Sequence, residues 1–115
     1  LSISFALIGA GIALLAMPWL STMALGIALV TFGFFGGHSV ASSWVGSRAG
    51  TMRAEASALY LFAYYLGSSV LGGVGGLAYA AWDWLGVCAF AAVLTLIGGG
   101  IVWALQQRAP QPVTA

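Results

Sequence analysis

The chain has 115 residues, of which 62% are hydrophobic and 4% are charged, and its formal net charge is +1. About a quarter of the residues in an ordinary soluble domain are charged, because surface side chains must face water. This composition excludes a soluble globular domain and predicts a surface that meets lipid.

The few charged residues leave long apolar stretches. No Asp, Glu, Lys or Arg occurs at positions 1–47, 56–82 or 84–107, and one helical crossing of a bilayer core needs about 20 apolar residues. The first stretch is long enough for two crossings, and Pro18 divides it, because proline disrupts a helix interior but is tolerated in the first turn. The sequence therefore predicts an all-α membrane protein with four transmembrane helices, at about residues 1–17, 19–46, 52–81 and 85–107.

The arginines predict how these segments are oriented. Arg48 and Arg53 lie between the second and third segments, and Arg108 follows the fourth. Short loops rich in Lys and Arg stay in the cytoplasm, so both termini are expected there, with residues 109–115 as a disordered cytoplasmic tail. The abrupt apolar start at Leu1 also leads us to expect that earlier helices of the same protein are missing.

Two stripes run along the predicted third segment at helical spacing. The first is polar and is formed by Ser57, Tyr60, Tyr64 and Ser68. Hydroxyl groups are costly in lipid, so this stripe is expected either to line a substrate cavity or to form hydrogen bonds between helices. The second is formed by the small residues Ser69, Gly72 and Gly76, and it predicts a face against which another helix packs closely.

The predicted second segment carries a matching polar arc. Its polar members include His38 and Ser42, with His38 well inside the span. An ionisable group at that depth usually faces the bundle interior or a wet path, and histidine exchanges a proton near neutral pH. The alternative is a neutral imidazole that is satisfied by a neighbouring hydroxyl or carbonyl group.

The charged loop has two interpretations. Arg48, Arg53 and Glu55 are expected to form either a cytoplasmic gate whose ion pairs break during a conformational cycle, or simple helix caps, since a carboxylate is stabilised near a helix N-terminus. Cys88 is alone in an apolar segment and offers neither a disulfide nor a metal site. We expect no metal and no cofactor.

Two motifs resemble the C-terminal end of a major facilitator superfamily transporter, in the bacterial efflux-type branch that handles sugars or drugs. They are Phe-Gly-Phe-Phe-Gly-Gly-His-Ser at positions 32–39 and Ala-Leu-Tyr-Leu-Phe-Ala-Tyr-Tyr-Leu-Gly at positions 58–67. The resemblance implies that the four segments are the last four of twelve helices. It also implies alternating access, and proton-coupled efflux (antiport) of a small solute across the bacterial inner membrane. Cavity roles then fall on His38, Ser42, Tyr60, Tyr64 and Ser68.

Other classes of protein remain open. A complete four-helix multidrug exporter that works as a dimer fits the length, but such proteins need a carboxylate in the first helix, and residues 1–17 contain none. A membrane subunit that does not transport also fits the composition. An enzyme is not expected, because His38 has no carboxylate partner in the membrane. The expected partners are a small-molecule substrate, the lipid bilayer and the missing N-terminal helices, and not nucleic acid.

Overall fold

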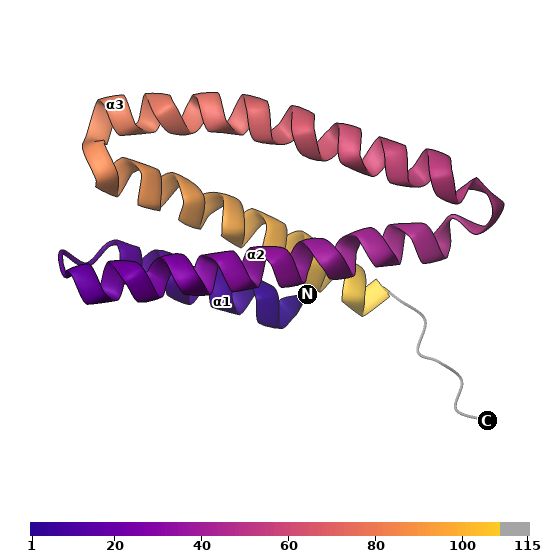
Figure 1. Cartoon of the computed structure of the whole chain (residues 1–115), viewed down its shortest axis with the longest axis horizontal. Helices are drawn as coiled ribbons and strands as arrows, with labels where there is room; N and C mark the ends of the chain where they lie inside the picture. Colours follow the sequence, from indigo (N-terminus) through magenta and orange to yellow (C-terminus); the bar gives the residue numbers. More distant parts are fainter. Residues whose placement is uncertain (109–115) are drawn as a thin grey trace.

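The chain folds into long helices that run back and forth beside one another (Figure 1). A computed structural model describes residues 1–108. In chain order the elements are α1 (Ser2–Leu15), α2 (Leu20–Arg48), the short 3₁₀ helix η1 (Gly50–Met52) and α3 (Arg53–Arg108). The expected tail at residues 109–115 lies outside the described residues.

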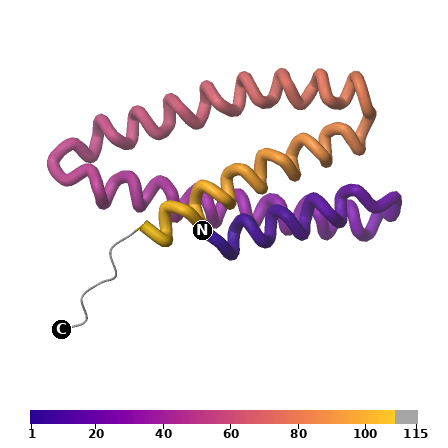
Figure 2. The backbone as a smooth tube through the Cα atoms, turned by 180° about the vertical axis from the view of Figure 1, so that it is seen from behind, coloured from indigo at the N-terminus to yellow at the C-terminus, as the bar shows by residue number. Residues whose placement is uncertain are grey.

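The longest helix, α3, reverses direction near its middle. Trp82 has φ −139° and ψ 22°, and Asp83 has φ 53° and ψ −148°, so neither residue is helical. Figures 1 and 2 show the ribbon folding back at this point. We call residues 53–81 the first arm and residues 84–108 the second arm. The two arms correspond to the predicted third and fourth segments, and the tight turn at Trp82 and Asp83 joins them.

Two of the described segments are long and apolar enough to cross a membrane. They are α2, with 29 residues, and the 59 residues of Gly50–Arg108. The 14 residues of α1 are fewer than the roughly 20 that a crossing needs. The helices thus support a membrane location, while the predicted count of four crossings stays a prediction.

Helices α1 and α2 pack closely through glycine. A Cβ atom added at Gly11 would lie 2.8 Å from the carbonyl oxygen of Gly26, and one at Gly26 would lie 2.8 Å from that of Gly11. A Cβ at Gly33 would similarly approach the carbonyl oxygen of Ser4 to 2.7 Å. Since only glycine permits such an approach, these residues set how closely the two helices lie.

The second arm of α3 runs antiparallel to α1 and is held at both ends. The indole Nε1 of Trp84 donates a 2.7 Å hydrogen bond to the carbonyl oxygen of Leu15, at the end of α1. The hydroxyl of Ser2 donates a 3.0 Å hydrogen bond to Oε1 of Gln106. The start of the chain consequently lies beside the end of α3 (Figure 2).

Most side chains remain exposed. Among residues 1–108 the buried hydrophobic side chains are Ile12 and Cys88, each 7% exposed. A surface so apolar cannot face water over its whole extent. Lipid or further helices must therefore cover most of it.

Candidate functional site

His38 joins α2 to the first arm of α3. Its Nδ1 lies 3.0 Å from the phenol oxygen of Tyr60, within hydrogen-bonding distance, and the tautomer of the ring decides which atom donates. The ring of Tyr64, one turn further along α3, lies 4.9 Å from the imidazole between centroids. Tyr60 and Tyr64 are four positions apart on α3, so both rings lie on the surface that faces His38.

Phe34 extends this contact by one turn of α2. Its ring stacks on the imidazole of His38 at 5.9 Å and 16° between planes, and lies 6.2 Å from the ring of Tyr64. The half-buried imidazole is therefore flanked by rings from both helices. We call Phe34, His38, Tyr60 and Tyr64 the aromatic cluster.

The aromatic cluster forms one wall of a cavity of about 450 Å³. Its other walls come from α1, α2 and the second arm of α3, including Phe5, Ile8, Trp44 and Val102. No Asp, Glu, Lys or Arg lines it. Recognition here would thus depend on apolar and aromatic surfaces, with the imidazole and the two phenol groups as the strongest polar contacts.

The aromatic cluster lies deep within its helices. His38 is ten positions before Arg48, the last residue of α2, which corresponds to roughly 15 Å along the helix axis. Tyr64 is eleven positions after Arg53, the first residue of α3, or roughly 16 Å. Both are about half of the roughly 30 Å thickness of a bilayer core.

The two serines that were predicted for the cavity lie apart from it. The hydroxyl of Ser42 donates a 3.1 Å hydrogen bond to the carbonyl oxygen of Ser39, and that of Ser68 donates a 3.0 Å bond to the carbonyl oxygen of Tyr65. Each hydroxyl group thus finds its hydrogen-bond acceptor on its own helix. Neither residue lines the cavity described above.

The small-residue stripe on α3 faces open space among the described residues. Ser69, Gly72 and Gly76 are exposed. A Cβ atom added at Gly72 or Gly76 would have no neighbour within 4 Å. The predicted packing role of this stripe therefore has no partner within residues 1–108 and stays a prediction.

Contacts other than ion pairs among Arg48, Arg53 and Glu55 hold the charged loop in place. Gly50, with φ +56°, ends α2 in the left-handed conformation that glycine adopts readily. Nε of Arg53 donates a 3.0 Å hydrogen bond to the carbonyl oxygen of Gly46, and the Arg48 guanidinium lies 4.0 Å from the centre of the Trp44 ring. Glu55 is exposed in the first turn of α3. The gate is a prediction that these contacts leave untested.

Several features escaped the sequence analysis. Phe34 was not selected, although its spacing of four from His38 signals a shared face. The close contacts of Gly11 with Gly26 and of Gly33 with Ser4 were also not predicted, since no local signal distinguishes these glycines from the run at positions 72–76. Within residues 1–108 no group of three His, Cys, Asp or Glu residues is placed to hold a metal ion.

Known proteins resemble the chain over part of its length. Over 78 residues it is 59% identical to the uncharacterized MFS-type transporter YybF of Bacillus subtilis (strain 168), a match that covers 68% of this chain and 19% of that protein. Over 65 residues it is 54% identical to the inner membrane transport protein YnfM of Escherichia coli (strain K12), covering 56% of this chain and 16% of that protein. An uncharacterized transporter of Buchnera aphidicola is 45% identical over 76 residues, a match that covers 66% of this chain and 18% of that protein.

The chain thus matches less than a fifth of the length of each of these relatives. No family model matches it, and neither does any solved structure. The relatives are transporters by name, and transporters are in general not enzymes. The resemblance to the major facilitator superfamily that the motifs indicated is therefore confirmed: the chain is similar to one part of longer MFS-type transporters.

Proposed function

We propose that the chain is part of a secondary active transporter that moves a small solute across the bacterial inner membrane by alternating access. The observation that carries this proposal is the contact of His38 with Tyr60 and Tyr64. An imidazole and two phenols from two helices line one cavity, which supports a substrate site near the bilayer midplane, where secondary transporters bind their substrates. The relatives named as transporters add support.

The proposed topology has four crossings. They are α1, α2 and the two arms of α3, with both turns that carry no arginine on the outer side of the membrane. Arg48, Arg53 and Arg108 then all lie on the cytoplasmic side, as short positively charged loops prefer. The C-terminus is cytoplasmic in this arrangement, and the segments are the last four of a twelve-helix transporter.

We further propose proton-coupled efflux, with His38 as the group that exchanges the proton. Imidazole is the side chain whose ordinary titration falls nearest to neutral pH. The hydrogen bond to Tyr60 gives His38 a partner that accepts or donates in either tautomer. A proton bound at Nδ1 would oblige the phenol to turn its own hydrogen away, which links the protonation state of the imidazole to the direction in which Tyr60 donates its hydrogen bond.

Transport assays on the full-length protein test this proposal. Everted membrane vesicles with a pH-sensitive dye would be given sugars and lipophilic drugs one at a time, and proton movement that depends on the solute would be recorded. We expect His38→Ala and Tyr64→Ala each to lower that signal about tenfold at unchanged membrane abundance. A tenfold loss corresponds to about 1.4 kcal/mol of lost interaction in the rate-limiting complex.

Tyr79→Ala is the matched control. Tyr79 is also on the first arm of α3, but it is 54% exposed and does not line the cavity. We expect this variant to transport as the wild type does. If no solute moves protons, or if all three variants lose transport equally, the assignment of the cavity is wrong.

A further inference from the structure

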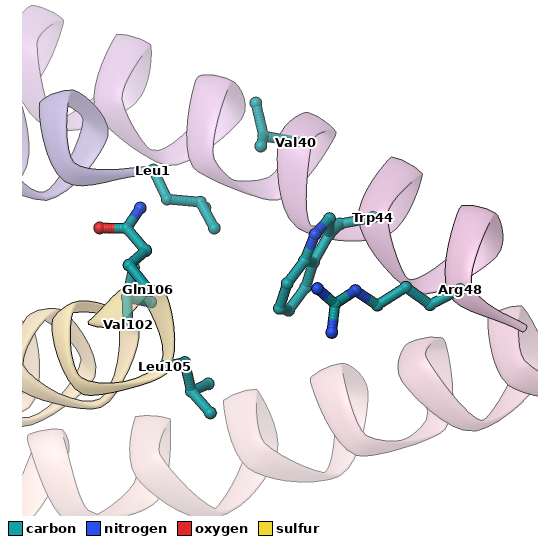
Figure 3. Close-up of a pocket in the computed structure, with 7 residues that line it drawn as sticks. All are labelled: Leu1, Val40, Trp44, Arg48, Val102, Leu105 and Gln106. Carbon is teal, nitrogen blue, oxygen red and sulfur yellow. The ribbon is translucent and has the colours of Figure 1, made fainter. Parts of the chain in front are cut away.

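A second pocket lies between the end of α2 and the end of the second arm of α3. It is a groove of about 300 Å³ (Figure 3), whose lining includes Val40, Trp44, Arg48, Val102, Leu105 and Gln106. Trp44 and Val102 also line the aromatic cavity and so stand between the two pockets. Nothing in the proposed transport cycle uses Arg48 or Leu105 as a binding group.

The groove has one charged end, and apolar side chains form most of its walls, with the amide of Gln106 as the other polar group. Arg48 is the last residue of α2, and its guanidinium lies 4.0 Å from the centre of the Trp44 ring. Figure 3 shows the guanidinium turned back beside the indole ring. A stacked guanidinium keeps its N–H donors in the plane of the group and available for an oxyanion.

The position of Arg48 along α2 places this charge at the edge of the bilayer. The 28 preceding residues of the helix contain no other Asp, Glu, Lys or Arg. Within residues 1–108 neither Glu55 nor Asp83 forms an ion pair with Arg48. The described helices therefore present a cation at the membrane boundary, directly above aliphatic surface.

We propose that this groove binds one phospholipid with an anionic headgroup. The phosphate lies on the Arg48 guanidinium, and one acyl chain runs toward the bilayer centre over Val40, Val102 and Leu105. Charge complementarity selects this occupant, because basic pockets between membrane helices on the cytoplasmic side attract anionic lipid headgroups. A free phosphate would leave the aliphatic walls empty, and a neutral lipid would leave Arg48 without an anion. The proposal rests on the membrane location and does not depend on transport.

Native mass spectrometry of the full-length protein in detergent tests the proposal. The protein is titrated with phosphatidylglycerol and, separately, with phosphatidylcholine of the same acyl chains. We expect phosphatidylglycerol to bind at least about fivefold more tightly than phosphatidylcholine, because the attraction of one arginine to an anionic lipid surface contributes about this factor. Arg48→Gln should remove this preference, and Arg48→Lys should keep most of it.

Two further variants separate a defined site from general surface charge. Arg108→Gln removes the same charge from the same side of the molecule, but Arg108 does not line the groove, so the preference should survive. Leu105→Trp leaves Arg48 in place and fills the apolar part, so the affinity for both lipids should fall. This variant also keeps the test decisive if Arg48→Gln proves unstable.

Several outcomes would overturn the proposal. Equal binding of the two lipids by the wild type would mean that the groove is closed by other protein or does not select charge. An equal loss in Arg108→Gln and Arg48→Gln would assign the preference to surface charge alone. Displacement of phosphatidylglycerol by millimolar inorganic phosphate would identify a phosphate site and not a lipid site.

Discussion

Nδ1 of His38 and the phenol oxygen of Tyr60 lie 3.0 Å apart, and they join helices α2 and α3 through side chains 22 positions apart in the chain. The two helices are also connected through the turn at Gly50, beside which Arg53 binds the carbonyl oxygen of Gly46. Toward its far end the first arm of α3 moves away from α2 (Figure 1). The aromatic cluster thus holds the first arm of α3 against the middle of α2.

The hydrogen bond itself can be tested with Tyr60→Phe, which removes the phenol oxygen and keeps the ring. We expect the free energy of unfolding to fall by about 1 kcal/mol, because the imidazole loses one partner in an apolar setting. Thermal unfolding in detergent measures this change. Ser68→Ala is the control, since its hydroxyl binds the carbonyl oxygen of Tyr65 on its own helix. An equal effect of the two substitutions would contradict a special role for the His38 contact.

The close approach of α1 to α2 predicts that Gly11 tolerates no larger residue. In Gly11→Ala the new methyl group would lie 2.8 Å from the carbonyl oxygen of Gly26, so the helices must separate at a cost of about 1–3 kcal/mol. Gly9→Ala, on the same helix, would meet nothing within 4 Å. It should leave stability unchanged or raise it, because alanine favours helix. Melting temperatures that fall equally in both variants would show that the two helices do not pack in this way.

The bond from Trp84 to Leu15 predicts a measurable loss in Trp84→Phe. The indole Nε1 donates to a carbonyl oxygen at the end of α1, where no further helical turn supplies a donor. We expect the free energy of unfolding to fall by about 1 kcal/mol. Trp82→Phe serves for comparison, because Trp82 is 72% exposed and is two positions away. A larger loss of stability in Trp82→Phe than in Trp84→Phe would argue against the hydrogen bond from Trp84 to Leu15.

The backbone at Asp83 predicts a stabilising substitution. With φ 53° and ψ −148°, this residue occupies a region that is open almost only to glycine and costs of order 1–3 kcal/mol for other residues. Asp83→Gly should therefore raise the melting temperature. Asp83→Ala removes the same charge but keeps the Cβ atom, so it should give no such increase. Equal increases in both variants would assign the effect to the charge and not to the backbone.

The open glycine face of α3 predicts where a further helix packs. A Cβ atom added at Gly76 would have no neighbour within 4 Å among the described residues, so the space beside this position is open. If the stripe of Ser69, Gly72 and Gly76 receives another helix, Gly76→Leu lowers the membrane abundance of the full-length protein. Gly100→Leu is the comparison, because this second-arm glycine also has open space. Unchanged membrane abundance in Gly76→Leu would contradict the prediction that another helix packs against this stripe.

Composition and the spacing of charges were sufficient for the broad class of the protein. A chain with 4% charged residues has to bury its surface in lipid, and helices are the elements that satisfy their own backbone groups there. The same reasoning selected His38, Tyr60 and Tyr64, because a polar group in an apolar helix is costly and usually faces a partner. These arguments need only local spacing and the polarity of each side chain.

The contacts between helices needed the tertiary structure. Helical spacing places Ser42 and Ser68 on the same arcs as His38 and Tyr64, yet their hydroxyls bind their own backbone, since periodicity says nothing about which rotamer a side chain adopts. Likewise, nothing local distinguishes Gly11, which meets Gly26, from Gly72, which meets open space. The relative placement of the helices decides those contacts, because packing depends on which surfaces are brought together, and residues distant in the chain determine that.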